Sequence, residues 1–446
     1  MHEWEELKRL SLLSSANLRT LTYTAGSSGS KLPLPSLRWR LFLGVLPIEL
    51  FGQDDTECQQ VWELAAERER QNYQALKARF IVDPTAVAKE ETDWKRMNPL
   101  SLDQDSPWHQ YHQDQDLRNT ILQDVSRTFP EESYFRHTRV QRLMADMLFV
   151  YAKMHTSLQY RQGMHELLAP LLLAVDGDSV APSKEFPTRL LDRAFIEHDT
   201  FALFDRLMRL CMPWYQLPPA LSPRATSDSQ TPIIAQCQML MDKLTVLDPE
   251  LSAHLRQMDI EPQLFGIRWY RLLFSRELPR LRDVFALWDI LFADNVSGTL
   301  RLVDWIGLVF LLANRRRLLQ GDYEDTLTTL LHLPPLPRPS SDVLEQTIAL
   351  PNNPQNHNIT AFPAIDLPIA APKIPFQSLS QHGLRAIQRL ALQAAYLRAH
   401  PSHEAAMLVA DQYRMWEQEA WDIIDDLDTP AIESSTSSDS IKPQPS

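Results

Sequence analysis

Two short segments of the sequence carry side chains that could act on a charged substrate. The first contains Asp124 and Arg127, which lie three residues apart and are therefore neighbours on one face of a helix. The second places Gln162 directly before Gly163. A guanidinium stays charged and makes several hydrogen bonds at once, whereas an amide both donates and accepts. Taken alone, these patterns are also typical of a surface ion pair, worth less than about 1 kcal/mol, and of a turn.

A helix is expected to connect the two segments. Between them, apolar residues recur at intervals of three and four, the pattern of a helix with one buried face. They are Val140, Leu143, Met144, Met147, Leu148 and Tyr151. Pro130 cannot continue the preceding helix, so that helix is expected to end at about Thr128 and to leave Arg127 at its end. A helix pair that folds back would bring Arg127 and Gln162 to one surface.

Composition places the chain among soluble globular proteins. Of 446 residues, 44% are apolar and 23% charged, and the net charge is -13. A chain this acidic is a poor candidate for binding nucleic acid, which requires clustered Lys and Arg. The N-terminus shows no signal peptide, and no apolar run reaches the roughly 20 residues of a membrane span. We therefore expect a cytosolic protein that reaches membranes only through partners.

The sequence contains no recognisable motif for a metal or for a bound nucleotide. Its cysteines are scattered and are expected to be free buried thiols in a reducing compartment. They are Cys58, Cys211 and Cys237. His165 and Glu166 begin a pattern similar to that of zinc proteases, but Ala169 stands where the second histidine is required. Neither a Walker A sequence nor G-x-S-x-G is present. We expect no cofactor and no metal.

With their flanks, the two segments resemble the TBC-domain family of GTPase-activating proteins for Rab GTPases. In that family the first segment reads I-x-x-D-x-x-R and the second Y-x-Q-G. Both patterns are intact here, and the residues that match them are Ile121, Asp124, Arg127, Tyr160, Gln162 and Gly163. The longer runs around them look most similar to the retromer-associated branch of the family. Residues 268–278 also match the family's R-W-x-x-x-L-F-x-R-E-L signature.

The first motif of the family, R-x-x-x-W, is only half present. Trp39 matches, but Pro35 occupies the position of the arginine. Arg38 or Arg40 could fill its role from another angle. Because that arginine is thought to brace the core in the family, its absence bears on local packing more than on chemistry.

The resemblance implies a division of work among the site residues. Arg127 would be an arginine finger that stabilises the charge developing on the phosphoryl oxygens. Gln162 would be a second finger that orients the attacking water. Asp124 would anchor Arg127, Tyr160 would orient the Gln162 loop, and Gly163 would allow close approach of the backbone. GTP and Mg would belong to the partner, so the protein would be a GTPase activator and not itself a hydrolase.

The expected fold is all-α, a two-lobed multi-helix TBC domain with a C-terminal helical extension. The expected domain bounds are 1–36 for an N-terminal segment and linker, and 37–332 for the TBC domain. A Pro-rich linker over 333–377, a helical segment over 378–428 and a disordered tail over 429–446 would follow. Residues 83–115 are polar and interrupted by prolines, so we expect an insertion loop there.

Short motifs suggest further partners. Trp4 and Leu7 have the form of motifs that dock on autophagy adaptors by strand addition, although both could simply pack on the domain. Leu100, in an Asn-Pro-Leu run, is expected either to contact retromer or to form part of a plain proline turn. Trp421 and Ile424 form a second adaptor motif or a helical packing face.

The resemblance thus predicts an activator of a Rab, of late-endosomal type, acting in endosomal membrane traffic and recruited peripherally to endosomal membranes. The alternative is an adaptor with little activity that binds retromer or autophagy proteins.

Overall fold

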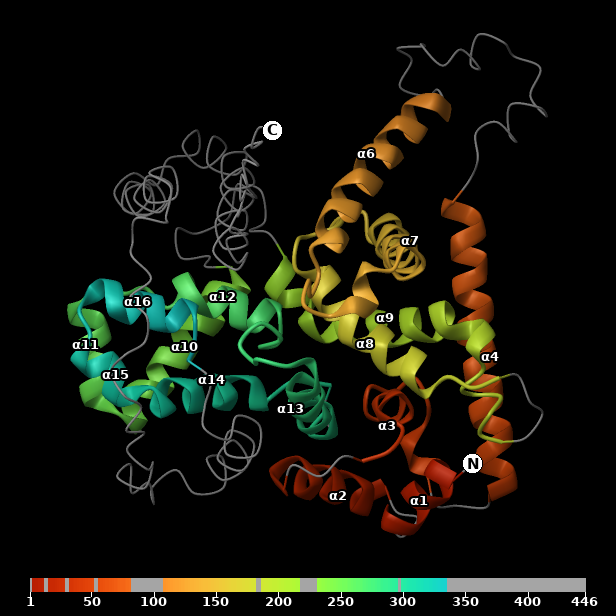
Figure 1. The fold of residues 1–446 in the computed structure, drawn as a ribbon, viewed down its shortest axis with the longest axis horizontal. Helices are drawn as coiled ribbons and strands as arrows, with labels where there is room; N and C mark the ends of the chain where they lie inside the picture. Colours follow the sequence, from red (N-terminus) through yellow and green to blue (C-terminus); the bar gives the residue numbers. More distant parts are fainter. Residues whose placement is uncertain are drawn as a thin grey trace, which may run out of the picture. The chain divides into compact units, whose positions relative to one another are not determined.

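The computed structural model describes residues 2–11, 15–28, 32–51, 55–81, 107–181, 186–216, 231–295 and 298–334. All of them belong to one compact unit, Met1–Leu217 with Gln230–Asp366. Within these ranges the structure is helical, and the only β-type pairing is a single bridge between Val180 and Asp192 (Figure 1). The prediction of an all-α fold is therefore confirmed for the described part of the chain.

The helices, in chain order, have the following bounds: α1 His2–Ser11, α2 Ser15–Ser28, α3 Pro35–Phe42, η1 Ile48–Leu50, α4 Asp55–Phe80, α6 Pro107–Ser126, η2 Ser133–Arg136, α7 Thr138–Met154, α8 Met164–Asp178, η3 Arg193–Phe195, α9 Ile196–Tyr215, α10 Pro232–Leu247, α11 Pro249–Gln257, α12 Gln263–Arg271, α13 Leu281–Ala293, α14 Leu302–Ala313, α15 Arg315–Gln320 and α16 Tyr323–Leu331.

These helices pack as two groups, as expected for a two-lobed domain. In one group α8 is surrounded by α3, α6, α7 and α9, and α4 packs against α7 and α9. In the other, α10 packs against α11, α12 and α14, while α15 packs against α11 and α16. Helix α9 contacts members of both groups, because it packs on α8 and also on α10 and α12 (Figure 1).

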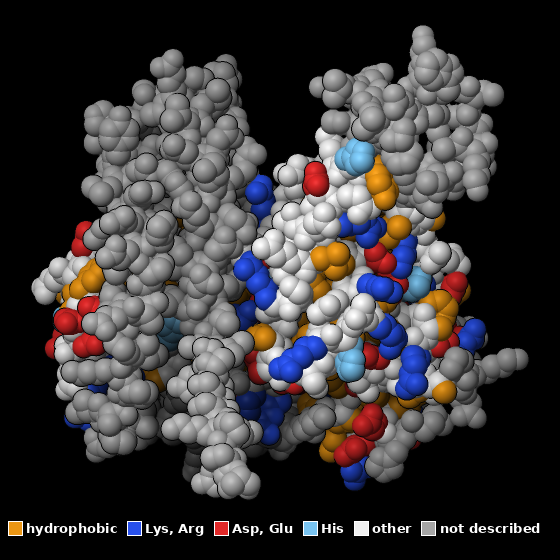
Figure 2. All heavy atoms as spheres, turned by 45° about the horizontal axis from the view of Figure 1, so that its top comes forward, with side chains coloured by type: hydrophobic (Ala, Val, Ile, Leu, Met, Phe, Trp, Pro, Cys, Tyr) orange, Lys and Arg blue, Asp and Glu red, His pale blue; other side chains and the backbone are white. Residues whose placement is uncertain are grey.

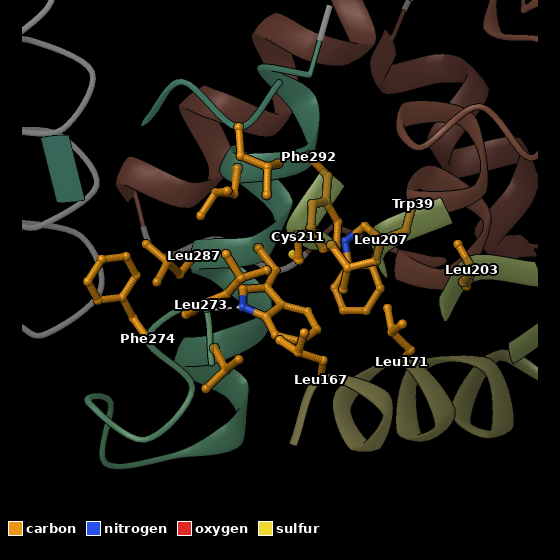
Figure 3. Close-up of a cluster of buried hydrophobic side chains, with 14 of the residues drawn as sticks. Trp39, Leu167, Leu171, Leu203, Leu207, Cys211, Leu273, Phe274, Leu287 and Phe292 are labelled. Carbon is orange, nitrogen blue, oxygen red and sulfur yellow. Dashed lines mark hydrogen bonds between the residues drawn. The ribbon is translucent and has the colours of Figure 1, made fainter. Parts of the chain in front are cut away.

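Helix α8 forms the centre of the first group. Every residue from Met164 to Leu172 is buried, on all faces of the helix, as expected for a core helix in a large domain. Figure 3 shows its Leu167 and Leu171 beside Leu207 of α9 and Trp39 of α3. The base of the Gln162 segment is therefore a rigid element, because Gly163 caps this helix.

The N-terminal segment differs from the prediction. Residues 1–36 were expected to be an N-terminal segment and linker, but α2 continues to Ser28 and α3 begins at Pro35. Helix α2 packs against α13. In α1, Trp4 and Leu7 are buried, and Trp4 makes edge-to-face contacts with Phe51, Trp62 and Phe186. The core thus includes residues that precede the predicted domain start at 37.

Two arginines compensate for the arginine missing at position 35. Arg38 pairs with Asp289 of α13 at 2.7 Å. Arg40 pairs with Asp199 of α9 at 3.2 Å, and Arg70 of α4 pairs with the same carboxylate at 2.8 Å. Both residues of α3 are fully buried, so their charges link three helices through the core. The expectation that Arg38 or Arg40 braces the core from another angle holds for both.

The helix before Arg127 begins earlier than expected. Residues 107–115 were assigned to the insertion loop, whereas they form the first half of α6. Two ion pairs join α6 to α7: Asp114 pairs with Lys153 at 2.7 Å, and Arg118, three residues beyond the assigned loop, pairs with Asp146 at 2.9 Å. A helix whose partner supplies charges does not need an apolar stripe along its whole length, which is why sequence periodicity missed it.

Several predictions fall outside the described residues. These are the remainder of the insertion loop with Leu100, the Pro-rich linker beyond residue 334, the C-terminal helical segment with Trp421 and Ile424, and the tail. Among the helices that are described, none is long and apolar enough to cross a membrane.

Candidate functional site

The first site residue, Arg127, lies one residue beyond the end of α6. Its guanidinium donates a 2.8 Å hydrogen bond to Oδ1 of Asp124, one turn earlier. The Asp124 side chain is 5% exposed, whereas that of Arg127 is 27% exposed. The chain then turns sharply, with Phe129 at a positive φ of 41°. Arg127 therefore projects from a rigid helix end and is held from behind by a buried carboxylate.

Tyr160 holds the other oxygen of the same carboxylate. Its hydroxyl donates a 2.6 Å hydrogen bond to Oδ2 of Asp124. Burial, together with the negative charge of Asp124, raises the pKa of Tyr160 well above its ordinary value, so the phenol keeps its proton. Asp124 thus joins the Arg127 segment to the loop that carries Gln162.

A buried chain of polar groups continues from Tyr160 into α8. Nδ1 of His165 lies 3.0 Å from the Tyr160 hydroxyl, and its Nε2 lies 3.4 Å from Oε1 of Glu166. Because the single proton of Tyr160 is given to Asp124, Nδ1 of His165 must be the donor in the contact with the hydroxyl. His165 is thereby fixed in one orientation between the two segments.

Arg276 closes this chain from the segment that follows α12. Its Nε and Nη2 atoms donate to Oε1 of Glu166 at 3.0 and 2.6 Å. Burial raises the pKa of Glu166, but the positive charge of Arg276 and the neighbouring His165 more than offset that effect and hold the pKa at about 2. Arg268 and Glu277 form a second buried pair in the same segment. Arg276 and Glu277, both in the R-W-x-x-x-L-F-x-R-E-L signature, therefore form buried ion pairs within the protein.

The Gln162 segment has a backbone that only glycine supports. Gly163 has φ of 94° and ψ of -23° at the start of α8. A Cβ atom at this position would lie 3.0 Å from Cδ2 of Leu272 and 3.3 Å from the hydroxyl of Tyr215. Both the left-handed conformation and the close packing therefore require glycine.

Gln162 itself has an unused hydrogen-bond acceptor. The residue is partly buried, and its Oε1 atom is shielded from solvent yet has no hydrogen-bond partner among the described residues. Leaving a buried acceptor unpaired costs roughly 1–3 kcal/mol. This free-energy cost is removed when a ligand or a water molecule donates a hydrogen bond to the atom, so Oε1 of Gln162 is suited to hold such a group.

The structure therefore brings together Asp124, Arg127 and Tyr160 in direct contact, with Gln162 and Gly163 in the same loop as Tyr160. It does not place Trp4 and Leu7 in a partner site: both are core residues on a helix, so the packing alternative describes them, and docking by strand addition would require them to leave the core.

Sequence analysis did not assign His165 or Glu166 to the site. They were considered only as part of an incomplete zinc motif. The available signal was their position in the first turn of the helix that follows Gln162, where a His-Glu pair in an apolar run must find buried partners.

The chemistry of the site favours an anionic partner group. Arg127 supplies a partly exposed guanidinium, and the carboxylate that it pairs with, Asp124, is buried behind it. Within the described ranges no group of three or more His, Cys, Asp or Glu side chains could hold a metal ion. The arrangement is able to donate to a charged oxygen through Arg127 and to accept from a water molecule through Gln162.

Comparison with protein families finds a match to the Rab-GTPase-TBC domain over residues 58–319. The match covers more than half of the chain and includes every residue of the site.

Curated proteins give a consistent picture. "TBC1 domain family member 5" of Mus musculus is 36% identical over 359 residues, which is 75% of this chain and 42% of that protein. The Homo sapiens protein of the same name is 36% identical over 357 residues, 74% of this chain and 43% of that protein. "TBC1 domain family member 13" of Homo sapiens is 24% identical over 372 residues, which is 68% of this chain and 86% of that protein. The chain thus spans less than half the length of the first two relatives.

Among solved structures, the Ypt/Rab-GAP domain of Gyp1p is similar, with a TM-score of 0.57. The match covers 78% of this chain and 96% of that one. At 18% identity, this likeness shows that the fold is shared.

Proposed function

The chain belongs to the Rab-GTPase-TBC domain family, and on this basis we propose that it accelerates GTP hydrolysis by a Rab GTPase. The observation that carries the proposal is the shared carboxylate of Asp124, which holds Arg127 with one oxygen and Tyr160 with the other. This shared carboxylate would hold the partly exposed guanidinium of Arg127 beside the loop that carries Gln162 before any partner binds.

In the proposed mechanism Arg127 enters the nucleotide site of the partner. Negative charge spreads over the phosphoryl oxygens in the transition state, and a guanidinium placed against them lowers the barrier. An arginine supplied in this way raises the rate by roughly 10³–10⁵, or about 4–7 kcal/mol. The partial exposure of Arg127 supports this role, because its side chain reaches solvent while the buried carboxylate of Asp124 holds it in place.

Gln162 would hold the attacking water. Its Oε1 atom would accept a proton of the water, and its amide nitrogen would donate to the partner. The unpaired state of Oε1 supports this assignment, since the water would satisfy it. Preorganisation matters because a donor or acceptor that is already in place avoids reorganisation during the reaction.

The remaining residues would position these two. Asp124 anchors Arg127, Tyr160 fixes the loop of Gln162 to Asp124, and Gly163 gives the loop its conformation. GTP and Mg would be bound by the partner, so this chain would need no cofactor of its own and would act as an activator, with Arg127 and Gln162 supplied in trans.

The similarity to the retromer-associated branch directs the choice of substrate to a late-endosomal Rab, with peripheral recruitment to endosomal membranes. Contact with retromer through Leu100, and with autophagy adaptors through Trp421 and Ile424, would provide the recruitment.

Single-turnover GTP hydrolysis by a panel of purified Rabs tests the proposal. The full chain is compared with Arg127→Ala and Gln162→Ala. Stimulation of one or a few Rabs that is lost in both variants supports the two-finger mechanism. A wild-type chain that stimulates none of them overturns it and leaves the adaptor function, which pull-down of retromer and autophagy proteins would then examine.

A further inference from the structure

A cationic segment follows the Arg127 loop directly. It consists of three side chains, all of them exposed: Arg136, Arg139 and Arg142. The sequence has no acidic residue between Glu132 and Asp146, although the chain as a whole carries a net charge of -13. Figure 2 shows Lys and Arg side chains to be prominent on one described face of the molecule.

The arginines of this cationic segment differ from most others in the described part of the chain. Arg118, Arg206 and Arg209, for example, each have a carboxylate partner within 3 Å. Arg139 and Arg142 form no hydrogen bond or ion pair with any described residue, and Arg136 donates only to a backbone carbonyl. Their positive charges are therefore not neutralised within this part of the protein.

The position of these charges is unfavourable for the fold. Arg139 and Arg142 lie in the first two turns of α7, which has no acidic residue in its first turn and no capping side chain. The N-terminus of a helix carries partial positive charge, and a cation there costs roughly 0.3–1 kcal/mol. The two arginines are also three residues apart, so they repel each other. Both effects destabilise the folded protein, so folding alone gives no reason for this arrangement. Acidic side chains of a bound partner would neutralise the two arginines and relieve both repulsions.

The cationic segment is firmly attached to the Arg127 loop. Nε of Arg136 donates to the carbonyl oxygen of Pro130 at 2.9 Å. The ring of Phe135 lies 5.6 Å from that of Phe129, which follows Arg127 by two residues and is itself buried. These contacts hold Arg136, the first residue of the cationic segment, beside the loop that follows Arg127, where a partner that receives Arg127 would lie close to it.

We propose that Arg136, Arg139 and Arg142 form a docking surface for acidic side chains that flank the nucleotide site of the GTPase. This inference rests on the proposed function, since it concerns the same partner. A local positive patch on an acidic protein both orients an acidic partner during encounter and discriminates against partners that present basic residues there. The patch would thus contribute to the choice among Rabs through binding, without taking part in the chemistry.

The experiment measures binding separately from hydrolysis. Dissociation constants are determined for the full chain and a panel of Rabs loaded with a non-hydrolysable GTP analogue, at about 50 and 500 mM salt. The test variant is Arg139→Glu/Arg142→Glu. The matched control is Arg9→Glu/Arg317→Glu, which changes the net charge equally at exposed arginines of α1 and α15. Single-turnover rates at saturating activator are measured in parallel.

We expect the test variant to bind the responsive Rab about tenfold more weakly at low salt, with the difference shrinking to about twofold at high salt, because exposed charges are screened. The saturating rate should be unchanged, and the control should bind like the wild type. Equal weakening in test and control variants, or weakening that does not depend on salt, overturns the inference.

Two further outcomes separate this inference from the proposed function. Salt-dependent binding without stimulated hydrolysis would refute the activator function and leave the docking surface in place. Stimulated hydrolysis together with Rab binding that Arg139→Glu/Arg142→Glu does not weaken would refute the docking surface alone. If Arg139→Glu/Arg142→Glu instead prevents the protein from floating with phosphatidylserine vesicles and leaves Rab binding intact, the cationic segment binds membranes and the inference fails.

Discussion

The hydroxyl of Tyr160 donates a 2.6 Å hydrogen bond to Oδ2 of Asp124, whose other oxygen accepts from Arg127 at 2.8 Å. The two segments that carry Arg127 and Gln162 are thus connected through one buried carboxylate. A displacement of either segment would weaken a charge-assisted hydrogen bond, which is stronger than a neutral one. The geometry of the two proposed fingers is therefore a joint property of both segments.

Replacing Tyr160 with phenylalanine should separate the two segments without emptying the core. Oδ2 of Asp124 would lose its donor while remaining buried, at a cost of about 1–3 kcal/mol. We expect the stimulated single-turnover rate to fall roughly tenfold, which corresponds to about 1.4 kcal/mol of barrier. Tyr73→Phe is the matched control, because it removes a 2.6 Å bond to Glu197 on another helix. Equal rates in the two variants would contradict the positioning role of Tyr160.

Gly163→Ala should destabilise the protein and also reduce activity. The substitution forces alanine into a φ of 94° and pushes Cβ against Leu272, so we expect a loss of about 2–4 kcal/mol in the free energy of unfolding. Gly44→Ala is the control, since Gly44 has φ of 72° but open space around its Cβ position. Urea unfolding of both variants measures the difference. A loss at Gly163 no greater than that at Gly44 would show that backbone conformation alone requires glycine there.

Sequence reasoning identified the elements of this site better than the contacts that join them. The ends of α6 and α7 could be anticipated from Pro130 and from the apolar spacing between Val140 and Tyr151, because local signals determine them. The pairing of Glu166 with Arg276 spans 110 residues and depends on packing that no local pattern encodes.

The N-terminal helices illustrate the same limit. Residues 24–36 have the composition of a linker, yet α2 is helical to Ser28 because it packs on α13. Tertiary contacts here outweigh local propensity. The burial of Trp4 likewise depends on Phe51, Trp62 and Phe186, which lie far along the chain.

Arg38→Met should be strongly destabilising. Burial raises the pKa of Asp289, while the charge of Arg38 and the hydrogen bonds from Arg38 and Trp39 oppose that shift. Removing the arginine leaves the carboxylate without its counter-charge, which costs about 3–5 kcal/mol. The double variant Arg38→Met/Asp289→Leu should recover part of this loss. Urea unfolding at pH 7 measures both. If the double variant is as unstable as the single one, packing of the Arg38 side chain, and not its charge, stabilises α3 against α13.

Glu166 should make the free energy of unfolding of the domain decrease at low pH. Its pKa is about 2 in the folded protein against an ordinary 4.5, because Arg276 and His165 outweigh the effect of burial. The folded state therefore binds this proton less readily than the unfolded state. The stabilisation is fully present above about pH 4.5 and is lost as the pH falls towards 2. The shift corresponds to about 3 kcal/mol.

The comparison of wild type with Glu166→Gln measures this contribution. The variant keeps the shape of the side chain but cannot ionise, so we expect it to be less stable by about 3 kcal/mol at pH 7 and to approach the wild type below pH 4. The free energy of unfolding in urea, determined at intervals from pH 7 to pH 3, gives the result. Arg276→Met should show the same loss at pH 7, because it leaves the Glu166 carboxylate buried without its main partner. If the free energies of unfolding of wild type and Glu166→Gln differ by a constant amount across this range, the neighbours of the carboxylate do not hold it ionised. The buried polar groups from Asp124 to Arg276 would then support Gln162 through packing alone.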